Sequence, residues 1–104
     1  MTSSPSLSGA LEAVERILNR GGEPHDVLDA VVGALHERGI PLASIRFVDG
    51  DELADGPSAG SGEGRTEPVV FHGRRVAELE LAVDDEEFVR RIAILISAYC
   101  AGEP

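Results

Sequence analysis

The side chains best suited to chemistry are one arginine and two glutamates in segments where apolar and polar residues alternate. Arg46 lies in ASIRFV, residues 43–48, and Glu78 and Glu80 lie in RVAELELAV, residues 75–83. Such alternation is typical of a strand with one buried face, so the three charged side chains are expected together on the polar face. If the two strands are neighbours, opposite charges across them stabilise the sheet by about 0.2–1 kcal/mol. The same groups could instead receive a ligand or partner, or serve as acid and base, although that face offers no apolar surroundings for acid–base work.

Histidine and cysteine are too scattered to predict a metal centre. His25 and His36 lie on one predicted helix, about three turns and therefore roughly 16 Å apart, which is too far to share a metal ion. His72 lies in a predicted turn, and the single cysteine, Cys100, can form neither an internal disulfide nor a thiolate site. We therefore expect no metal and no cofactor. The candidate ligand-binding residues are Arg46, Glu78, Glu80 and His72.

The central segment DGPSAGSGEGRTEP, residues 55–68, has no large apolar side chain. Its GSGEG run is superficially similar to a phosphate-binding loop, but such a loop needs a preceding buried strand, a following helix and a lysine. The chain contains no lysine at all. We therefore predict a flexible loop over residues 55–67, acting as a connector.

Composition narrows the class of partner. Nine basic residues face 19 acidic ones, giving a formal net charge of -10, which argues against binding nucleic acid or an anionic membrane. The longest apolar run, IAILISAYCA at residues 92–101, is too short to cross a bilayer. The first ten residues show no secretory signal, so we predict a cytoplasmic protein. A length of 104 residues predicts one domain.

The remaining pattern predicts the elements that position these residues. Helical periodicity runs from Ser8 to the Gly21–Gly22 pair, from Pro24 to Gly39, and from Asp84 to the end, after a flexible tail at residues 1–7. Strands are predicted at residues 43–48, 68–71 and 75–83, with a weak one at 52–54. This order predicts an α+β fold with helices packed on one face of an antiparallel sheet. The apolar stripe of the last helix is wider than a sheet face covers, so a second helix layer or a second subunit must cover the rest.

Two long segments resemble the GAF domain family. They are HDVLDAVVGALHERGIPLASIRFVDGDEL, residues 25–53, and EPVVFHGRRVAELELAVDDEEFVRRIAILISAYCA, residues 67–101, with Gly73 at the turn glycine of the family pattern and Leu79 and Leu81 at its apolar strand positions. The resemblance implies a GAF/profilin-like sheet of about four strands in the order 2-1-4-3. It also implies a shortened domain, because the region that walls the ligand pocket in GAF domains is represented only by residues 55–67. No cyclic-nucleotide or bilin-attachment motif is present there.

The resemblance also implies an assembly, because GAF domains commonly dimerise through their first and last helices. A homodimer would use the apolar residues of those helices, which are Leu11, Val14, Leu18, Ile92, Leu95, Ile96 and Tyr99. The alternative is that the helices of one chain simply cover each other.

Three functions remain open at this point. The first is a non-enzymatic, GAF-like regulatory or interaction module in signal transduction, homodimeric through its helices. The second is a stand-alone sensor that binds a small-molecule ligand at the polar sheet face. The third is a small enzyme that uses Glu78 and Glu80.

Overall fold

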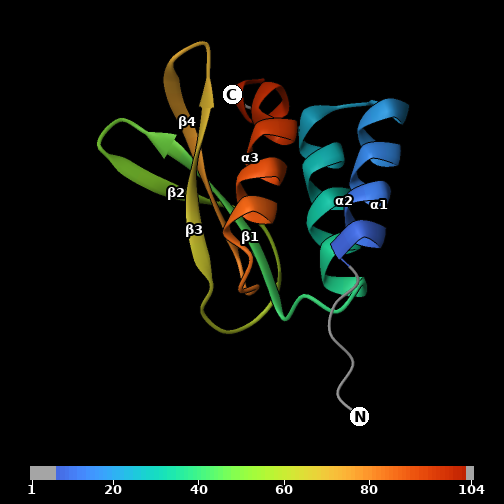
Figure 1. Ribbon diagram of the computed structural model, residues 1–104. Helices are drawn as coiled ribbons and strands as arrows, with labels where there is room; N and C mark the ends of the chain where they lie inside the picture. Colours follow the sequence, from blue (N-terminus) through green and yellow to red (C-terminus); the bar gives the residue numbers. More distant parts are fainter. Residues whose placement is uncertain (1–6, 103–104) are drawn as a thin grey trace.

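The structure, a computed structural model, describes residues 7–102 and has the predicted α+β architecture (Figure 1). Its elements are α1 (Leu7–Arg20), α2 (Pro24–Glu37), β1 (Leu42–Asp49), β2 (Glu52–Gly60), β3 (Arg65–Phe71), β4 (Arg74–Leu81) and α3 (Glu86–Ala101). The fold-class prediction is therefore confirmed. The tail predicted at residues 1–7 lies outside the described residues, except for Leu7, which begins α1.

The four strands form one antiparallel sheet in the order β2-β1-β4-β3, the order that the resemblance implied. Two hairpins, β1–β2 and β3–β4, are joined along their inner strands, where Ala43 pairs with Leu81 and Phe47 pairs with Ala77. Alternation along these strands sends their apolar side chains to one face, where Ile45 and Leu79 are completely buried. One face of the sheet is thus buried, and the charged residues of β1 and β4 lie on the other face.

All three helices lie on the same side of the sheet, in two layers (Figure 1). α2 packs against β1 and β2, and α3 packs against β3 and β4. α1 packs on α2 and α3, so it forms the outer layer. This second layer covers part of the apolar stripe of α3 that the sheet leaves open. Of the two coverings expected for that wide stripe, a second helix layer is therefore present within the chain. Of the described helices, none is both long and apolar enough to cross a membrane.

Burial within one chain corrects part of the predicted dimer interface. Val14, Ile92 and Ile96 have 0% exposed surface, because α1, α2, α3 and the sheet close around them. These three side chains belong to the core of the chain and cannot present an interface to a second copy. Leu11, Leu18, Leu95 and Tyr99 are only partly buried, and pack against the same core. The hydroxyl of Tyr99 donates a hydrogen bond to the Leu18 carbonyl oxygen at 3.1 Å, which ties α3 to α1.

The prediction of a flexible loop over residues 55–67 is wrong for most of that range. β2 continues to Gly60 and β3 begins at Arg65, so only residues 61–64 connect the two strands. The strand uses small residues because the chain passes close to its neighbours. A side chain at Gly56 would collide with the ring of Phe47 and the carbonyl oxygen of Ile45. The lack of large side chains in this segment therefore reflects close backbone packing rather than the absence of structure.

Each outer strand of the sheet carries a proline in its interior. Pro57 is buried in β2, beside a register shift in the β1–β2 ladder, and Pro68 lies opposite Glu78 in β3. Proline has no N–H to offer a further strand, so it is tolerated at edges and interrupts pairing there. Both outer edges are thereby less suited to adding a strand.

Candidate functional site

The open face of the sheet gathers the charged residues predicted from sequence. We call Arg46, Asp55, Arg75, Glu78 and Glu80 the charged ladder. Arg46 lies opposite Glu78 of β4 on one side and opposite Asp55 of β2 on the other. Its Nε atom is 4.0 Å from Asp55 Oδ1. The structure therefore brings Arg46 and the two glutamates onto neighbouring strands, as the resemblance implied, and onto the same face, as the alternation predicted.

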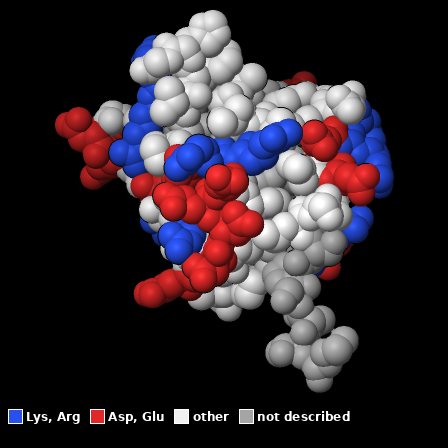
Figure 2. Space-filling view, in the orientation of Figure 1, with Lys and Arg blue, Asp and Glu red and all other residues white. Residues whose placement is uncertain are grey.

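Ion pairs within the charged ladder occupy most of its groups. Arg75 donates from Nη2 to Glu78 Oε2 at 2.8 Å, while Arg46 approaches Asp55. The Arg46 and Asp55 side chains are 47% and 98% exposed, so water screens their attraction and the pair contributes little to stability. Acidic and basic side chains are also intermixed over the side of the molecule that Figure 2 shows. The open face of the sheet presents both signs of charge, which suits recognition of a complementary surface.

Glu80, a member of the charged ladder, also has a structural role. One of its carboxylate oxygens accepts a hydrogen bond from the backbone N–H of Gly64 at 2.9 Å. This contact holds the 61–64 connection against the sheet, where the Gly64 backbone lies close to the Leu81 carbonyl. The carboxylate is thereby used as an acceptor for the fold. Sequence reasoning placed Glu80 on the correct face but did not foresee this partner.

His72 does not join the other candidates. It occupies the β3–β4 turn with a φ of 52°, and its ring packs on Phe71 at a centroid distance of 4.1 Å. Along β3 it is four residues beyond Pro68, the partner of Glu78, which at the usual rise of a strand is roughly 13 Å. His72 therefore belongs to the hairpin tip and not to the charged ladder.

A separate ion pair closes the opposite end of the sheet. Arg65 Nη2 donates to Asp84 Oδ1 at 2.8 Å, joining the start of β3 to the connection between β4 and α3. This hydrogen bond and the negative charge of Asp84 raise the pKa of Arg65. Because both side chains are exposed, the pair orients the strand end rather than forming a binding site.

One cavity of the described residues was not predicted from sequence. It lies at the end of the sheet where the two hairpin tips diverge, has a volume of about 620 Å³, and we call it the end hollow. Its walls come from β1, β2 and β4, and its back comes from the start of α2 and the end of α3. The lining residues are His25, Phe47, Val48, Asp49, Gly50, Ala54, Asp55, Gly56, Arg74, Arg75, Val76, Cys100 and Ala101.

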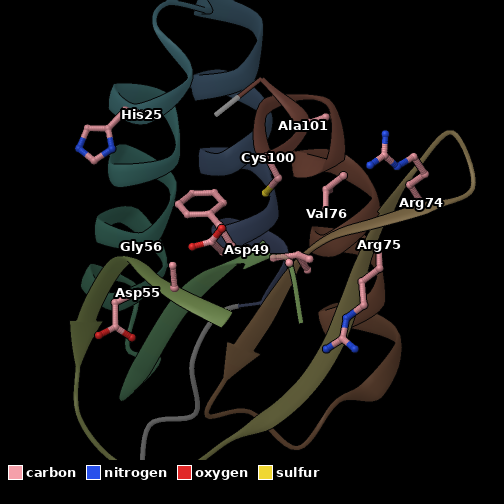
Figure 3. A pocket seen from close by; sticks show the side chains of 13 residues that line it. His25, Asp49, Asp55, Gly56, Arg74, Arg75, Val76, Cys100 and Ala101 are labelled. Carbon is pink, nitrogen blue, oxygen red and sulfur yellow. The ribbon is translucent and has the colours of Figure 1, made fainter. Parts of the chain in front are cut away.

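Side-chain directions distinguish the interior of the end hollow from its rim. Cys100 and Val76 point into the same space, whereas Arg75 and Asp55 turn away from it (Figure 3). Cys100 is 3% exposed and Val76 packs against the core, so the floor is apolar. The only sequence signals for this site were the Asp49-Gly50 and His72-Gly73 turns, which mark two hairpin tips but do not show that they separate.

The described part of the chain has no cluster of three or more histidine, cysteine or acidic residues arranged to hold a metal ion. His25 and His36 lie at opposite ends of α2, as their spacing predicted. His36 Nδ1 lies 3.0 Å from the carbonyl oxygen of Ile40, a contact that closes the end of α2.

Comparison with known proteins gives no match, either to a protein-family model or to a curated protein. The function must therefore be argued from two features of this chain, the open sheet face and the end hollow.

Proposed function

We propose that the protein is a non-enzymatic, GAF-like interaction module that presents its open sheet face to a protein partner. The observation that carries this proposal is the placement of all three helices on one side of a four-stranded sheet. The other face holds the charged ladder together with two exposed apolar side chains, Leu53 at 38% and Val70 at 49% exposure. A surface with apolar residues among fixed charges of both signs has the makeup of a modest protein interface. The net charge of -10 favours a neutral or basic partner.

The hydrogen bonds that Glu78 and Glu80 accept within the chain support a binding role over an enzymatic one. Glu78 accepts a hydrogen bond from Arg75, and Glu80 accepts one from the Gly64 amide. A general acid or base needs its carboxyl group within reach of the substrate proton, in surroundings that tune it for transfer. Here both groups hold parts of the fold and lie on an open face. Loss of a catalytic activity in the folded Glu78→Gln/Glu80→Gln double variant would therefore contradict the binding role and favour an enzymatic one.

Site-specific photo-crosslinking in the cells that make the protein tests the proposed surface. A benzophenone amino acid at Val70 or Leu53 should form a covalent adduct, because both side chains project from the open face. The same amino acid at Ala30, an exposed position on α2, is the control and should form none. Adducts at neither sheet position, or equally at Ala30, would contradict the proposal. The adduct mass distinguishes a different protein from a second copy of this chain.

We further propose that the module is a homodimer, with an interface revised by the burial of its core. Of the predicted interface, Leu11, Leu18, Leu95 and Tyr99 remain partly exposed on the helices, and the neighbouring Ile94 is 65% exposed. Sedimentation velocity at micromolar concentration should give the dimer mass. Ile94→Glu should shift the protein toward monomer, and a monomeric wild-type chain would refute this part of the proposal.

A further inference from the structure

Within residues 7–102, the strand edges that line the end hollow have no partner strand. Pairing between β1 and β4 ends at Phe47 and Ala77. Beyond that point residues 48–49 pair only with β2, and residues 74–75 pair only with β3. The two hairpins diverge there, as the separated tips in Figure 1 show. The inner edges of both strands therefore turn unpaired main-chain groups toward the end hollow, and such groups are strong hydrogen-bonding sites.

The floor between these edges suits one apolar side chain. Phe47 and Val76 are partly buried, and Cys100 at the end of α3 is almost completely buried beneath them. A volume of about 620 Å³ lies within the range of roughly 300–1,000 Å³ typical of ligand sites. The apolar floor and the polar main-chain walls together suit an extended peptide. The backbone of such a peptide pairs with a strand edge, and every second side chain points toward the floor.

The charges at the rim favour a carboxylate on the β4 side. Arg74 lines the end hollow, and its guanidinium makes no ion pair within residues 7–102. Arg75, by contrast, is held by Glu78 and turns away (Figure 3). Asp49, at the end of β1 on the opposite side of the end hollow, repels an anion there. With a net charge of -10, the chain also disfavours a ligand with several negative charges.

We propose that the end hollow binds the C-terminus of an extended, non-acidic peptide. The peptide main chain pairs with the inner edge of β4, its last apolar side chain lies on the floor, and its terminal carboxylate approaches Arg74. The outer edges of the sheet are poorer sites for the same ligand because Pro57 and Pro68 interrupt them. This proposal does not rest on the open sheet face. The charged ladder and the lining of the end hollow share Asp55 and Arg75, but the peptide contacts proposed here are to the inner edge of β4, the apolar floor and Arg74.

Nuclear magnetic resonance of the full ¹⁵N-labelled chain tests the proposal. The probes are N-acetylated tetrapeptides ending in valine, leucine or phenylalanine, each prepared with a free C-terminal carboxylate and with a C-terminal amide. The free acids should shift the amide signals of residues 48–49 and 74–76, and the amidated forms should bind roughly tenfold more weakly, since a charge-assisted hydrogen bond is lost. Absence of binding by every free acid at about 1 mM, equal binding of the amides, or shifts confined to the open sheet face would each overturn it.

Two matched pairs of variants locate the peptide. Arg74→Gln should remove the preference for the free acid, whereas Arg16→Gln on the exposed surface of α1 should retain it. Ala101→Trp should fill the end hollow and weaken binding by at least about tenfold. Ala98→Trp, at an exposed position on the same helix outside the hollow, should not. Unchanged peptide binding in folded Ala101→Trp protein, or unchanged acid preference in Arg74→Gln, would overturn the assignment.

Discussion

Replacing Gly56 with alanine should destabilise the protein by about 1–3 kcal/mol, the usual cost of overpacking a well-filled site. The added β-carbon would lie 2.5 Å from Cε2 of Phe47 and 2.6 Å from the carbonyl oxygen of Ile45. Unstrained contacts between carbon atoms lie near 3.5–4.0 Å, so both neighbours would have to move by about an ångström. The Phe47 ring can rotate, but the Ile45 carbonyl belongs to the central strand of the sheet. For a domain of this size, each kcal/mol lowers the melting temperature by roughly 4–8 °C.

Gly33→Ala is the matched control for this experiment. Gly33 lies inside α2, and a β-carbon there meets nothing within 4 Å. Alanine in a helix interior is more favourable than glycine by about 0.5–1 kcal/mol, so this variant should be more stable than the wild type. Urea unfolding followed by circular dichroism measures both changes, and a constant denaturant slope shows that they reflect stability alone.

A second variant separates the two collisions at Gly56. Phe47→Ala removes the ring but leaves the Ile45 carbonyl in place, so in this background Gly56→Ala should cost less without becoming neutral. Gly56→Ala protein as stable as the wild type would refute the close packing of β2 on β1. A penalty that disappears completely without the ring would refute the part assigned to the backbone.

Three further substitutions test individual contacts. Tyr99→Phe removes the hydroxyl that donates to a carbonyl of α1, and should lower the unfolding free energy by about 0.5–1.5 kcal/mol in urea titrations. Asp85→Ala removes the side chain that accepts the Phe88 N–H at the start of α3, and should cost about 0.5–2 kcal/mol, with a smaller cost for Asp85→Asn. Glu80→Ala frees the Gly64 amide, so its hydrogen exchange should accelerate while the slowest core amides change little; uniform acceleration would contradict a local role.

The elements with strong periodicity were predictable, and so was the class they form. α2 and α3 have clear apolar stripes and start signals, including Pro24 at the beginning of α2 and the acidic run before α3. The residue that caps α3 is Asp85, one position after Asp84, where the sequence placed the start of this helix. Alternation in β1 and β4 placed Arg46 and Glu78 correctly on the open face. These features depend on local sequence, which a single chain displays fully.

The second half of β2 and the end hollow were not predictable for a different reason. Residues 55–60 form a strand although their composition is that of a loop, because the neighbouring strand supplies the partners and the space admits only small side chains. Tertiary context overrides propensity in such segments. The end hollow depends on where pairing between β1 and β4 stops, which is a property of two strands about thirty residues apart and of no local pattern.

The outer position of α1 has a consequence for how the molecule opens. The helix contributes only Ala10, Ala13 and Val14 to the buried residues, and it rests on other helices instead of the sheet. Partial unfolding should therefore begin with α1, ahead of the sheet with α2 and α3. In that partly open state the apolar surface of α3 becomes accessible without loss of the sheet. Exchange of α1 between two copies is then a low-cost route to an intertwined pair, in which each chain completes the outer layer of the other.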